Sequence, residues 1–510
     1  MRQAVKRYPA LLLVLLLLLG ACSQTGSIQP SGGSGIYYEI FVGSFYDSDG
    51  DGLGDLQGII SKLDYLNNES GEESLGVSGI WLMPINPSPS YHKYDVTDYY
   101  AIDPAYGTME DFEQLIAECE KRGIDVIIDL VVNHSSSQHP WFLAAVDEVK
   151  TGAEPKYQNY YHFSQEKESA DWYSTAGGWY YEAIFWSEMP DLNMDSQEMR
   201  DEIANIAAFW LDKGVKGFRL DAAKHIYDTR EENLAFWQWF SGVCRGIKED
   251  VFLVGEVWSG ENEIYAYYGS GLDALFNFPF SGSDGIINGS VRTKDGATLA
   301  SNLERFMKNI RERNPDAIHA PFLSNHDTDR SAGYIVDPHR RKLQAAIYLL
   351  MPGIPFVYYG EELGITGRGK DENKRTAMIW SLTDRTGQTE NPSGALEPEP
   401  VSGGVAEMLS DPDSLLHYYR AAIALRTEFP SLQTGEVIAL KAPDRQVFAV
   451  MIGEVAVLHN LSGESVEVDI QTLCPGMELG AYLSPTGKEI DANGTFILPP
   501  YASAVLKPAR

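Results

Sequence analysis

Strand and helix patterns alternate along most of this 510-residue chain, from Ile36 to about Arg426. Short apolar segments separated by longer amphipathic ones are typical of a parallel sheet whose strands are joined by helices. Eight such units predict an α/β fold, a (β/α)8 TIM barrel. The expected strands are Ile36–Ser44, Val77–Ile85, Ile124–Val132, Val215–Asp221, Val251–Val257, Ala274–Asn277, Ile318–Ser324 and Ile354–Tyr359.

Three segments do not fit a bare barrel of ~250 residues. Residues 133–190, after the third strand, are rich in aromatic residues and show few helical repeats, so we expect a small irregular inserted domain there. Residues 366–412, after the eighth strand, are rich in Gly, Pro, Glu and Asp and predict a long loop. Residues 429–510 contain short alternating runs, which predict a C-terminal all-β sandwich. The barrel then comprises residues 36–132 and 191–428.

The N-terminal residues predict export. Basic residues precede an apolar run at residues 10–19, which is too short to span a bilayer and is typical of a signal peptide. The run ends in Leu19-Gly20-Ala21-Cys22, which resembles the bacterial lipobox; ordinary signal cleavage nearby is the alternative. We interpret residues 1–21 as a lipoprotein signal peptide, Cys22 as the lipidated first residue, and residues 22–35 as a flexible tether. The expected location is the bacterial cell envelope, with the lipid anchor as the membrane attachment.

The net charge and the number of cysteines argue against a nucleic-acid partner and against a disulfide framework. The net charge is −32, from 40 basic and 72 acidic residues, which argues against a nucleic-acid partner; solubility or adaptation to salt would also explain an acidic surface. With Cys22 assigned to the lipid, Cys119, Cys244 and Cys474 remain, an odd number that predicts no disulfide framework.

Charged residues gather where four of the predicted strands end. Arg219 and Asp221 share one face of the fourth strand, and such a pair is costly inside a barrel unless it lies at an open end. A structural ion pair would explain it equally well in isolation. However, the third strand is followed by His134, the fifth ends at Glu256 and the seventh is followed by Asp327. All these ends meet at the carboxyl-end mouth of a barrel, where catalytic residues lie.

Three carboxylates at one barrel mouth suit the cleavage of a glycosidic bond. Two of them are the minimum, one as nucleophile and one as acid/base. A third anion would stabilise the positive charge of an oxocarbenium-like transition state.

Four motifs resemble the signature regions of the α-amylase family of retaining glycosidases, glycoside hydrolase family 13. The motifs are Leu130–Ser135, Gly217–His225, Glu256–Trp258 and Phe322–Asp327, and the resemblance covers Ile36 to the C-terminus. It implies that Asp221 is the nucleophile, Glu256 the general acid/base and Asp327 the stabiliser of the transition state. Arg219 would keep Asp221 ionised, whereas Glu256 needs a raised pKa to hold its proton.

The same resemblance assigns residues to the sugar in the cleavage subsite. His134 and His326 would hydrogen-bond its hydroxyl groups; a zinc site is the alternative, but no further His/Cys ligand pattern supports it. Tyr94 matches the family's aromatic platform, which stacks on a pyranose face, unless it is simply a core tyrosine. Lys224 and His225 resemble the residues of members that cleave α-1,4 bonds.

Three further positions bear on the bond that is cleaved. Ala222 stands where relatives specialised for α-1,6 bonds carry a β-branched residue, and Tyr91 stands where relatives that trim terminal glucose carry Asp. Both favour an endo-acting α-amylase on starch and maltodextrins. Met189–Asn193 instead resembles a subgroup intermediate between oligo-1,6-glucosidases and neopullulanases. A neopullulanase- or cyclomaltodextrinase-like hydrolase, a 4-α-glucanotransferase and a non-catalytic glucan-binding protein are the alternatives. We expect a monomer without an organic cofactor, acting on α-glucans.

An acidic loop after the first strand predicts a structural calcium site. Its carboxylates would repel one another without a cation, and their spacing matches the opening of an EF-hand loop. Gly52 stands at the sharp turn, but Gly58 replaces the closing Glu, so this is no EF-hand; a solvated acidic turn is the alternative. The loop also resembles the calcium loop of neopullulanase-like amylases. The expected ligands are Asp47, Asp49, Asp51, the Leu53 carbonyl and Asp55.

Overall fold

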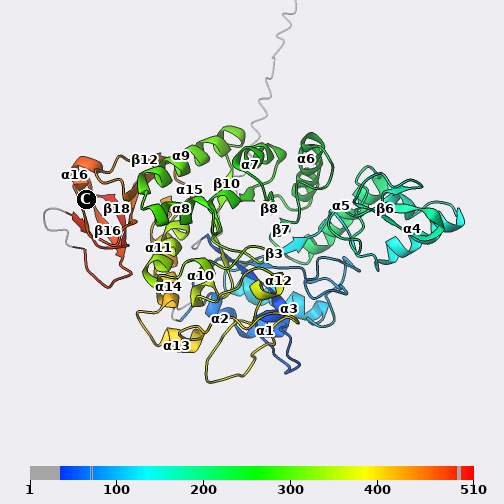
Figure 1. Cartoon of the computed structure of the whole chain (residues 1–510), viewed down its shortest axis with the longest axis horizontal. Coiled ribbons are helices and arrows are strands. Elements are labelled where there is room, and N and C mark those ends of the chain that lie inside the picture. The colour runs from blue at the N-terminus through cyan, green and yellow to red at the C-terminus, as the bar shows by residue number, and fades with distance from the viewer. Residues whose placement is uncertain (1–34, 69–70, 72, 491–495, 510) are drawn as a thin grey trace, which may run out of the picture.

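The computed structural model describes residues 35–68, 71, 73–490 and 496–509. The predicted signal peptide, Cys22 and all of the predicted tether except Gly35 lie outside the described residues. Figure 1 shows an elongated molecule with a central barrel, a domain containing α4 and β6 at one end, and the C-terminal domain at the other.

Eight parallel strands form the barrel, in the order β10-β9-β8-β7-β3-β2-β1-β11. Backbone hydrogen bonds connect the first and last of them, from Ile354 N to His319 O at 2.7 Å and from Phe356 N to Pro321 O at 2.9 Å. The predicted barrel is therefore confirmed, and each strand lies within its expected range. The strands are β1 (Tyr37–Ile40), β2 (Gly79–Leu82), β3 (Asp125–Leu130), β7 (Gly217–Leu220), β8 (Phe252–Gly255), β9 (Ala274–Phe276), β10 (Ile318–Ala320) and β11 (Phe356–Tyr358).

Helices pack around the outside of this barrel (Figure 1). The helix α3 (Met109–Lys121) begins at a capping box formed by Thr108 and Asp111, and it ends before Gly123, whose φ of 64° suits a C-terminal glycine. The other barrel helices are α1 (Leu56–Ser61), α2 (Leu63–Leu66), α5 (Gln197–Asp212), α6 (Arg230–Ile247), α7 (Glu261–Tyr267), α8 (Ile286–Thr293), α9 (Gly296–Arg313), α10 (Ser331–Tyr334), α11 (Pro338–Leu349), α14 (Leu415–Glu428) and α15 (Ser431–Thr434).

The barrel interior below the catalytic end is a packed apolar core. Twelve buried side chains form one cluster there, among them Trp81, Phe276 and Phe356. The rings of Phe276 and Phe356 meet edge to face, with centroids 4.8 Å apart. At the upper edge of this core the Trp81 indole N–H donates to Asp129 Oδ2 at 3.2 Å, so the apolar interior ends where the charged site begins.

The inserted domain is more regular than we expect from its sequence. It contains a 12-residue helix, α4 (Pro140–Thr151), and a three-stranded sheet in the order β4-β6-β5. Pro140 occupies the first turn of α4 and Gly152, with φ of 68°, follows its end, so the chain does carry start and stop signals for a helix. The expectation of few helical repeats is wrong here. The strands are β4 (Phe163–Ser164), β5 (Trp172–Ser174) and β6 (Tyr180–Glu182).

The C-terminal domain consists of a five-stranded sheet, β12-β13-β14-β18-β16, and a two-stranded sheet, β15-β17. Strands β12 to β15 overlap the four alternating runs in the sequence, whereas β16 to β18 are additional. The runs are Val437–Ala442, Val447–Ile452, Val455–Leu461 and Val466–Ile470. The elements are β12 (Val437–Ala439), β13 (Val447–Ile452), β14 (Val455–Asn460), β15 (Val466–Val468), α16 (Ile470–Leu473), β16 (Met477–Leu483), β17 (Phe496–Leu498) and β18 (Ser503–Pro508).

Two further predictions can be compared with the described residues. The long loop at residues 366–412 contains only the short α-helices α12 (Asp371–Lys374) and α13 (Val405–Leu409), as expected. The cysteines Cys119, Cys244 and Cys474 are buried and form no disulfide. Within the described part of the chain, no helix combines the length and the apolar character needed to cross a bilayer.

Candidate active site

The three predicted catalytic carboxylates line one cavity of about 400 Å³ at the carboxyl-end mouth of the barrel. Asp221 directly follows β7, Glu256 directly follows β8, and Asp327 lies on the loop after β10. The remaining lining residues are His92, Tyr94, His134, Phe185, Trp186, Met189, Ala222, Trp258, Asp371 and Arg375.

Arg219 is the cation at the centre of this site. Its side chain is fully buried in β7 and contacts three carboxylates: Asp221 Oδ1 at 2.5 Å, Asp129 Oδ1 at 2.8 Å and Glu256 Oε2 at 3.0 Å. Parallel pairing aligns Arg219 with Asp129 of β3, which explains their contact. The predicted contact between Arg219 and Asp221 is therefore present, and Asp129 is a partner that sequence reasoning missed.

Glu256 has the protonation behaviour that a general acid needs. Burial raises its pKa, and the charges of Asp221 and Asp327 act in the same direction, while Arg219 opposes them. Its Oε2 also accepts the backbone N–H of Ala222 at 2.9 Å. Ala222 has a φ of 45°, a strained conformation for a residue with a side chain, and this turn directs its N–H toward Glu256.

Asp327 is held by two cationic partners. Arg375, from the long loop after β11, donates to Asp327 Oδ1 at 2.9 Å, and His326 Nε2 lies 2.9 Å from Oδ2. Burial alone would raise the pKa of Asp327, but the charge and hydrogen bond of His326, together with Arg375, place it well below its usual value. Asp327 therefore remains ionised. Arg375 could not be singled out from the sequence, because its loop has no regular pattern.

The two predicted sugar-binding histidines differ in their surroundings. His134 Nδ1 pairs with Asn133 Oδ1 at 3.0 Å, while its buried Nε2 has no partner and lines the cavity. Burial lowers the pKa of His134, so its ring is neutral. A buried polar atom without a partner is costly, which makes this Nε2 a candidate contact for a ligand hydroxyl. Both ring nitrogens of His326, in contrast, face protein groups.

Tyr94 is buried below the catalytic groups. Its hydroxyl donates to Asp129 Oδ2 at 3.1 Å and lies 2.7 Å from His326 Nε2, and its ring stacks on His326 at 5.6 Å. The ring also lines the cavity, and its stacking on a sugar stays a prediction. These contacts fix the orientation of the ring before any ligand binds.

Lys224 and His225 lie at the rim and are not among the residues that line the cavity. Lys224 Nζ donates to the carbonyl of Trp258 at 2.9 Å, and the ring of His225 meets that of Phe185 edge to face at 5.3 Å. Both thus support aromatic residues that do line the cavity. The predicted contact of Lys224 and His225 with substrate stays a prediction.

Three exposed aromatic residues surround the opening. Phe185, Trp186 and Trp258 are 48%, 46% and 49% exposed, although large apolar side chains are normally covered. Trp258 stacks on Phe278 with centroids 5.1 Å apart and an interplanar angle of 9°, which holds its ring in place. Phe185 and Trp186 belong to the aromatic-rich segment 133–190 and Trp258 to the third motif, but the sequence assigned none of these rings a place at the opening.

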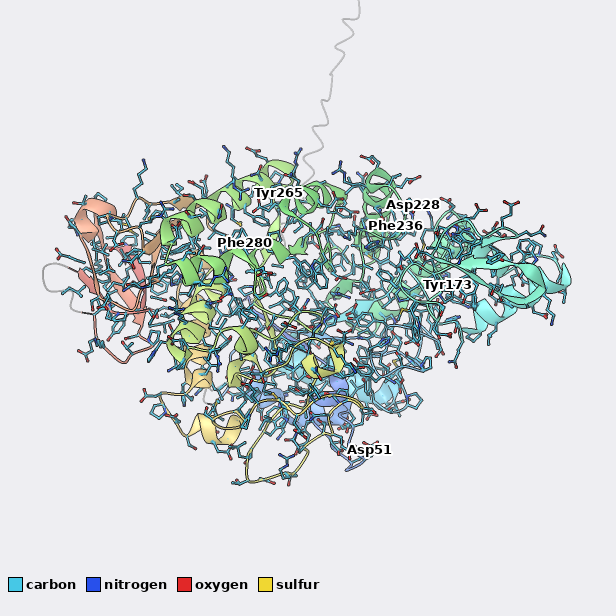
Figure 2. All side chains as sticks on the ribbon, viewed as in Figure 1. Asp51, Tyr173, Asp228, Phe236, Tyr265 and Phe280 are labelled. Atoms are coloured by element: carbon cyan, nitrogen blue, oxygen red, sulfur yellow. The ribbon has the colours of Figure 1, made fainter. Side chains whose placement is uncertain are left out.

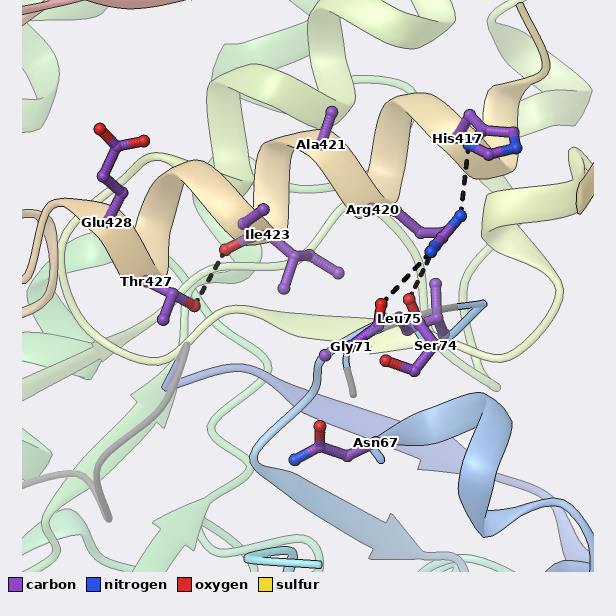
Figure 3. A pocket seen from close by; sticks show the side chains of 12 residues that line it. Asn67, Gly71, Ser74, Leu75, His417, Arg420, Ala421, Ile423, Thr427 and Glu428 are labelled. Carbon is purple, nitrogen blue, oxygen red and sulfur yellow. Dashed lines mark hydrogen bonds between the residues drawn. The ribbon is translucent and has the colours of Figure 1, made fainter. Parts of the chain in front are cut away.

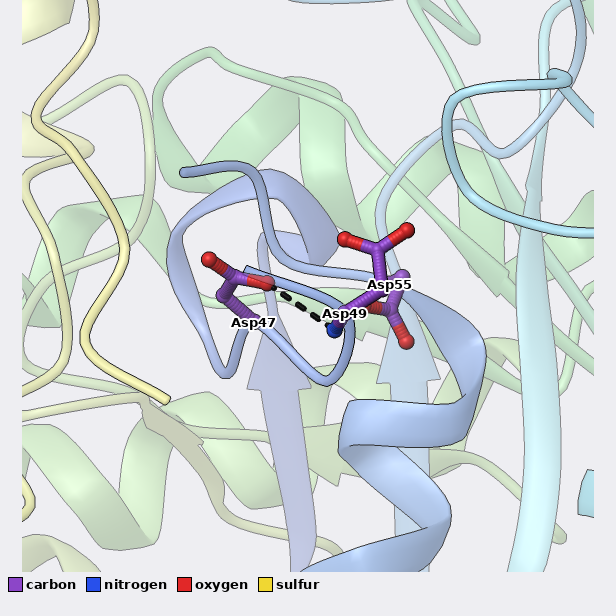
Figure 4. A group of neighbouring side chains, drawn as sticks. All are labelled: Asp47, Asp49 and Asp55. Carbon is purple, nitrogen blue, oxygen red and sulfur yellow. Dashed lines mark hydrogen bonds between the residues drawn. The ribbon is translucent and has the colours of Figure 1, made fainter. Parts of the chain in front are cut away.

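The acidic loop lies on the barrel next to the long loop after β11. The carboxylate oxygens of Asp47, Asp49 and Asp55 lie within 4.8 Å of one another (Figure 4), whereas Asp51 is outside that group. Asp51 lies at the edge of the molecule, away from Tyr173 of the inserted domain (Figure 2). Gly52 has a φ of 94°, as the predicted sharp turn requires.

Backbone groups of the acidic loop satisfy part of its charge. Asp47 accepts N–H groups from Asp49, Gly50 and Gly52, at 3.1, 2.6 and 2.8 Å. Asp55 accepts the N–H of Gly58 at 2.7 Å and so caps α1. Three clustered carboxylates with no Lys or Arg among their hydrogen-bond partners form a set of hard oxygen donors, which fits Ca²⁺.

A second cavity, of about 670 Å³, lies between α14 and the segment that precedes β2 (Figure 3). This is the amino-terminal side of the strands, opposite the catalytic carboxylates. Its charged residues are Arg420, which donates to the Ser74 carbonyl at 2.7 Å, and Glu428. We assign no chemistry to this cavity.

Comparisons with known proteins agree with this geometry. A family model described as the alpha amylase catalytic domain matches residues 39–435. The chain is 42% identical over 449 residues to Alpha-amylase 3 of Dictyoglomus thermophilum, covering 86% of each chain. It is 30% identical over 450 residues to a 4-alpha-glucanotransferase of Thermotoga maritima, covering 84% of this chain and 96% of that one. The solved structure of Eubacterium rectale Amy13B matches with a TM-score of 0.88 at 39% identity, covering 94% of this chain and 96% of that one.

Proposed function

The chain belongs to the alpha-amylase family of retaining glycoside hydrolases and is therefore an enzyme, and we propose that it is an α-amylase. Its proposed reaction is the hydrolysis of internal α-1,4-glucosidic bonds in starch and maltodextrins. One observation carries the proposal: Asp221, Glu256 and Asp327 line a single cavity, and Arg219 contacts the first two.

In the first step of the proposed mechanism, Glu256 gives its proton to the glycosidic oxygen as the bond to C1 breaks. A carboxylate oxygen of Asp221 bonds to C1 and forms a glycosyl-enzyme, and the sugar on the other side leaves. In the second step, Glu256 takes a proton from water, which attacks C1 and releases Asp221. Two displacements at C1 retain its configuration. Asp327 remains anionic throughout and stabilises the positive charge that develops on the ring.

Features of the cleft support an endo-acting enzyme. Tyr91 lies beside the cavity with its hydroxyl 3.4 Å from Arg375 Nη1, at the position where relatives that trim chain ends carry Asp. Without that Asp, nothing at this position selects a chain end. The exposed rings of Phe185, Trp186 and Trp258 offer stacking surfaces for sugars on either side of the scissile bond.

The alternatives use the same catalytic groups and differ in substrate or acceptor. A neopullulanase- or cyclomaltodextrinase-like hydrolase is supported by Met189–Asn193. A 4-α-glucanotransferase is supported by the 30% identical relative of that name.

A product profile distinguishes these functions. The full chain is incubated with soluble starch, pullulan, cyclodextrin and maltotriose, and products are separated by chromatography. Fast viscosity loss on starch with little action on pullulan or cyclodextrin is the expected result. Preference for pullulan or cyclodextrin would indicate a neopullulanase- or cyclomaltodextrinase-like hydrolase. Oligosaccharides longer than maltotriose, formed from maltotriose, would indicate glucan transfer.

For the acidic loop we propose a structural Ca²⁺ site. Asp47, Asp49 and Asp55 would supply carboxylate oxygens, and the Leu53 carbonyl and Asp51 would complete the ligands after a small adjustment of the loop. Bound Ca²⁺ would supply charge that holds the loop together, and it takes no part in the reaction. The proposal is tested by the thermal unfolding measurement described in the Discussion.

We also propose that the protein is exported and attached to the cell envelope through lipidated Cys22. The support is the sequence of residues 1–22 alone. Metabolic labelling with a radioactive fatty acid tests it: the full chain should incorporate label, and a Cys22→Ser variant should not. Equal labelling of both forms would refute the anchor.

A further inference from the structure

His326 lies between two carboxylates on opposite sides of its ring. Nδ1 is 2.6 Å from Glu39 Oε1, and Nε2 is 2.9 Å from Asp327 Oδ2. Nε2 is also 2.7 Å from the Tyr94 hydroxyl, which itself donates to Asp129. Glu39 and His326 are buried, so their polar atoms face protein groups rather than bulk water.

The identity of these neighbours fixes the protons on the ring. An ionised carboxylate only accepts hydrogen bonds, and a neutral imidazole has one N–H and one lone pair. A neutral His326 would therefore direct a lone pair at either Glu39 or Asp327. Because the Tyr94 hydroxyl gives its proton to Asp129, its oxygen also accepts from Nε2. Both nitrogens consequently carry hydrogen, and the ring is a cation.

Groups from six segments face this ring, and most of them favour its charge. Burial alone would lower the pKa of His326, but Asp327 and Glu39 raise it to about 9. The neighbouring cation Arg375 donates to the backbone carbonyl of His326 rather than to the ring. The surrounding groups are Glu39 of β1, Trp81 of β2, Tyr94 after β2, Asp129 of β3, Asp327 after β10 and Arg375 of the long loop.

We propose that Glu39 is a positioning residue for the cleavage site, which holds the His326 ring in place and doubly protonated so that Nε2–H is directed at Asp327. The inference rests on the proposed function, because that function places His326 and Asp327 at the cleaved sugar. Glu39 itself does not line the cavity and acts only through His326.

The position of Glu39 in the fold makes this role specific. It is the third residue of β1, aligned with Trp81 of β2 and Tyr358 of β11, so its backbone is fixed by strands on both sides. An amide at this position would keep a hydrogen bond to Nδ1 but would remove the negative charge. The ring would then lose its proton as the pH rises through neutrality, and Asp327 would lose a charged donor.

The first test uses the unmodified protein. Nitrogen chemical shifts of ¹⁵N-histidine-labelled protein are recorded from pH 5 to pH 10, with His326 assigned by its absence in a His326→Asn variant. We expect both nitrogens of His326 to be protonated at pH 7.5 and to titrate near pH 9. A neutral ring at pH 7.5 would overturn the proposal, whether or not any variant folds.

The second test follows kcat against pH in a Glu39→Gln variant. Removing the charge should lower the pH at which His326 titrates by at least about one unit. The alkaline fall in kcat should therefore begin at a lower pH. At pH 8 we expect kcat to fall about 10-fold or more, with KM changed less than about threefold. Glu39→Asp, which keeps the charge, should restore part of the alkaline limb.

Glu362 provides a matched control, because it is a buried carboxylate next to β1 that accepts the hydroxyls of Tyr38 and Tyr65. Glu362→Gln should leave the alkaline limb in place, even if it lowers stability. An alkaline limb that is the same in Glu39→Gln and the parent, or that moves equally in Glu362→Gln, would contradict the proposal. The nitrogen spectra need no substrate, so they test the role of Glu39 even if the proposed substrate is wrong. A wrong substrate would show only in the product profile.

Discussion

Two clusters of carboxylates lie on this barrel, and they differ in where their positive charge comes from. At the mouth, Asp129, Asp221 and Glu256 surround the buried side chain of Arg219. In the acidic loop, the carboxylate oxygens of Asp47, Asp49 and Asp55 lie within 4.8 Å of one another and accept hydrogen bonds mainly from backbone N–H groups. Arg219 offsets part of the charge of the first cluster from within the chain, whereas we propose that a cation from solution does so for the second.

The difference follows from what each cluster has to do. Catalytic carboxylates must keep fixed and unequal proton affinities, and a buried arginine supplies a constant charge, because it does not lose its proton. A loop needs only to be held together, and an exchangeable ion is sufficient for that. The long loop after β11 contacts both regions. Its Gly387 carbonyl accepts the N–H of Asp47, and its Glu390 N–H donates to the carbonyl of Gly52. The same loop carries Arg375, which contacts Asp327 at the mouth.

Removing the nucleophile should have the largest effect. In Asp221→Asn the amide cannot bond to C1, so we expect kcat to fall at least about 10⁴-fold. Calorimetric binding of maltoheptaose should persist, because Asp221 is only one of many cavity residues. Asp147→Asn, an exposed carboxylate on α4, serves as the control. Turnover of Asp221→Asn within tenfold of the parent would refute the assignment.

Removing the built-in cation should affect both activity and stability. Arg219→Leu leaves three buried carboxylates without their partner, and losing one member of a buried ion network costs about 3–5 kcal/mol. Arg219→Lys keeps the charge but cannot contact all three carboxylates, so its losses should be smaller. Urea unfolding measures the stability of each variant. A stability of Arg219→Leu equal to that of the parent would mean that Arg219 does not neutralise this cluster.

Removing the external cation should mainly affect stability. The unfolding free energy should be about 2–3 kcal/mol lower in EGTA than in saturating Ca²⁺. The midpoint of thermal unfolding should also be lower in EGTA. Asp49→Asn should abolish the response to Ca²⁺, whereas Asp147→Asn should retain it. Asp51→Asn shows whether that residue joins the ligands. An unfolding midpoint of the parent that is independent of Ca²⁺ would favour a solvated acidic turn.

The smallest effect is expected when a new carboxylate is added beside Arg375. Tyr91→Asp places an acid near Arg375 and recreates the pattern of relatives that trim chain ends. We expect the share of glucose among early starch products to rise a few-fold, while Tyr91→Phe should resemble the parent. An unchanged product pattern in Tyr91→Asp would remove Tyr91 as support for endo action.

The barrel was predictable because its strands are continuous apolar segments, and its chemistry because Asp221, Glu256 and Asp327 directly follow such segments or lie close after them. Residues whose roles depend on tertiary contacts were not. Asp129 and Glu39 stand inside strands and acquire partners only when the barrel closes. Arg375 lies in a loop without periodicity.

Secondary structure outside the barrel was harder to predict for local reasons. The helix α4 is surrounded by aromatic residues that obscure its period, although Pro140 and Gly152 mark its ends. The strand β16 contains Gly480 and a shift in register, which weakens its alternating pattern. The pairing of β16 with β18 therefore decides its final form more than its local pattern does.

In the proposed reaction, cleavage proceeds with retention through Asp221 and Glu256. The most direct measurement is proton NMR of the products released from maltoheptaose in the first minutes, before the anomers equilibrate. We expect α-anomers at the new reducing ends. Initial release of β-anomers would contradict this mechanism, because a single displacement by water would then replace the glycosyl-enzyme.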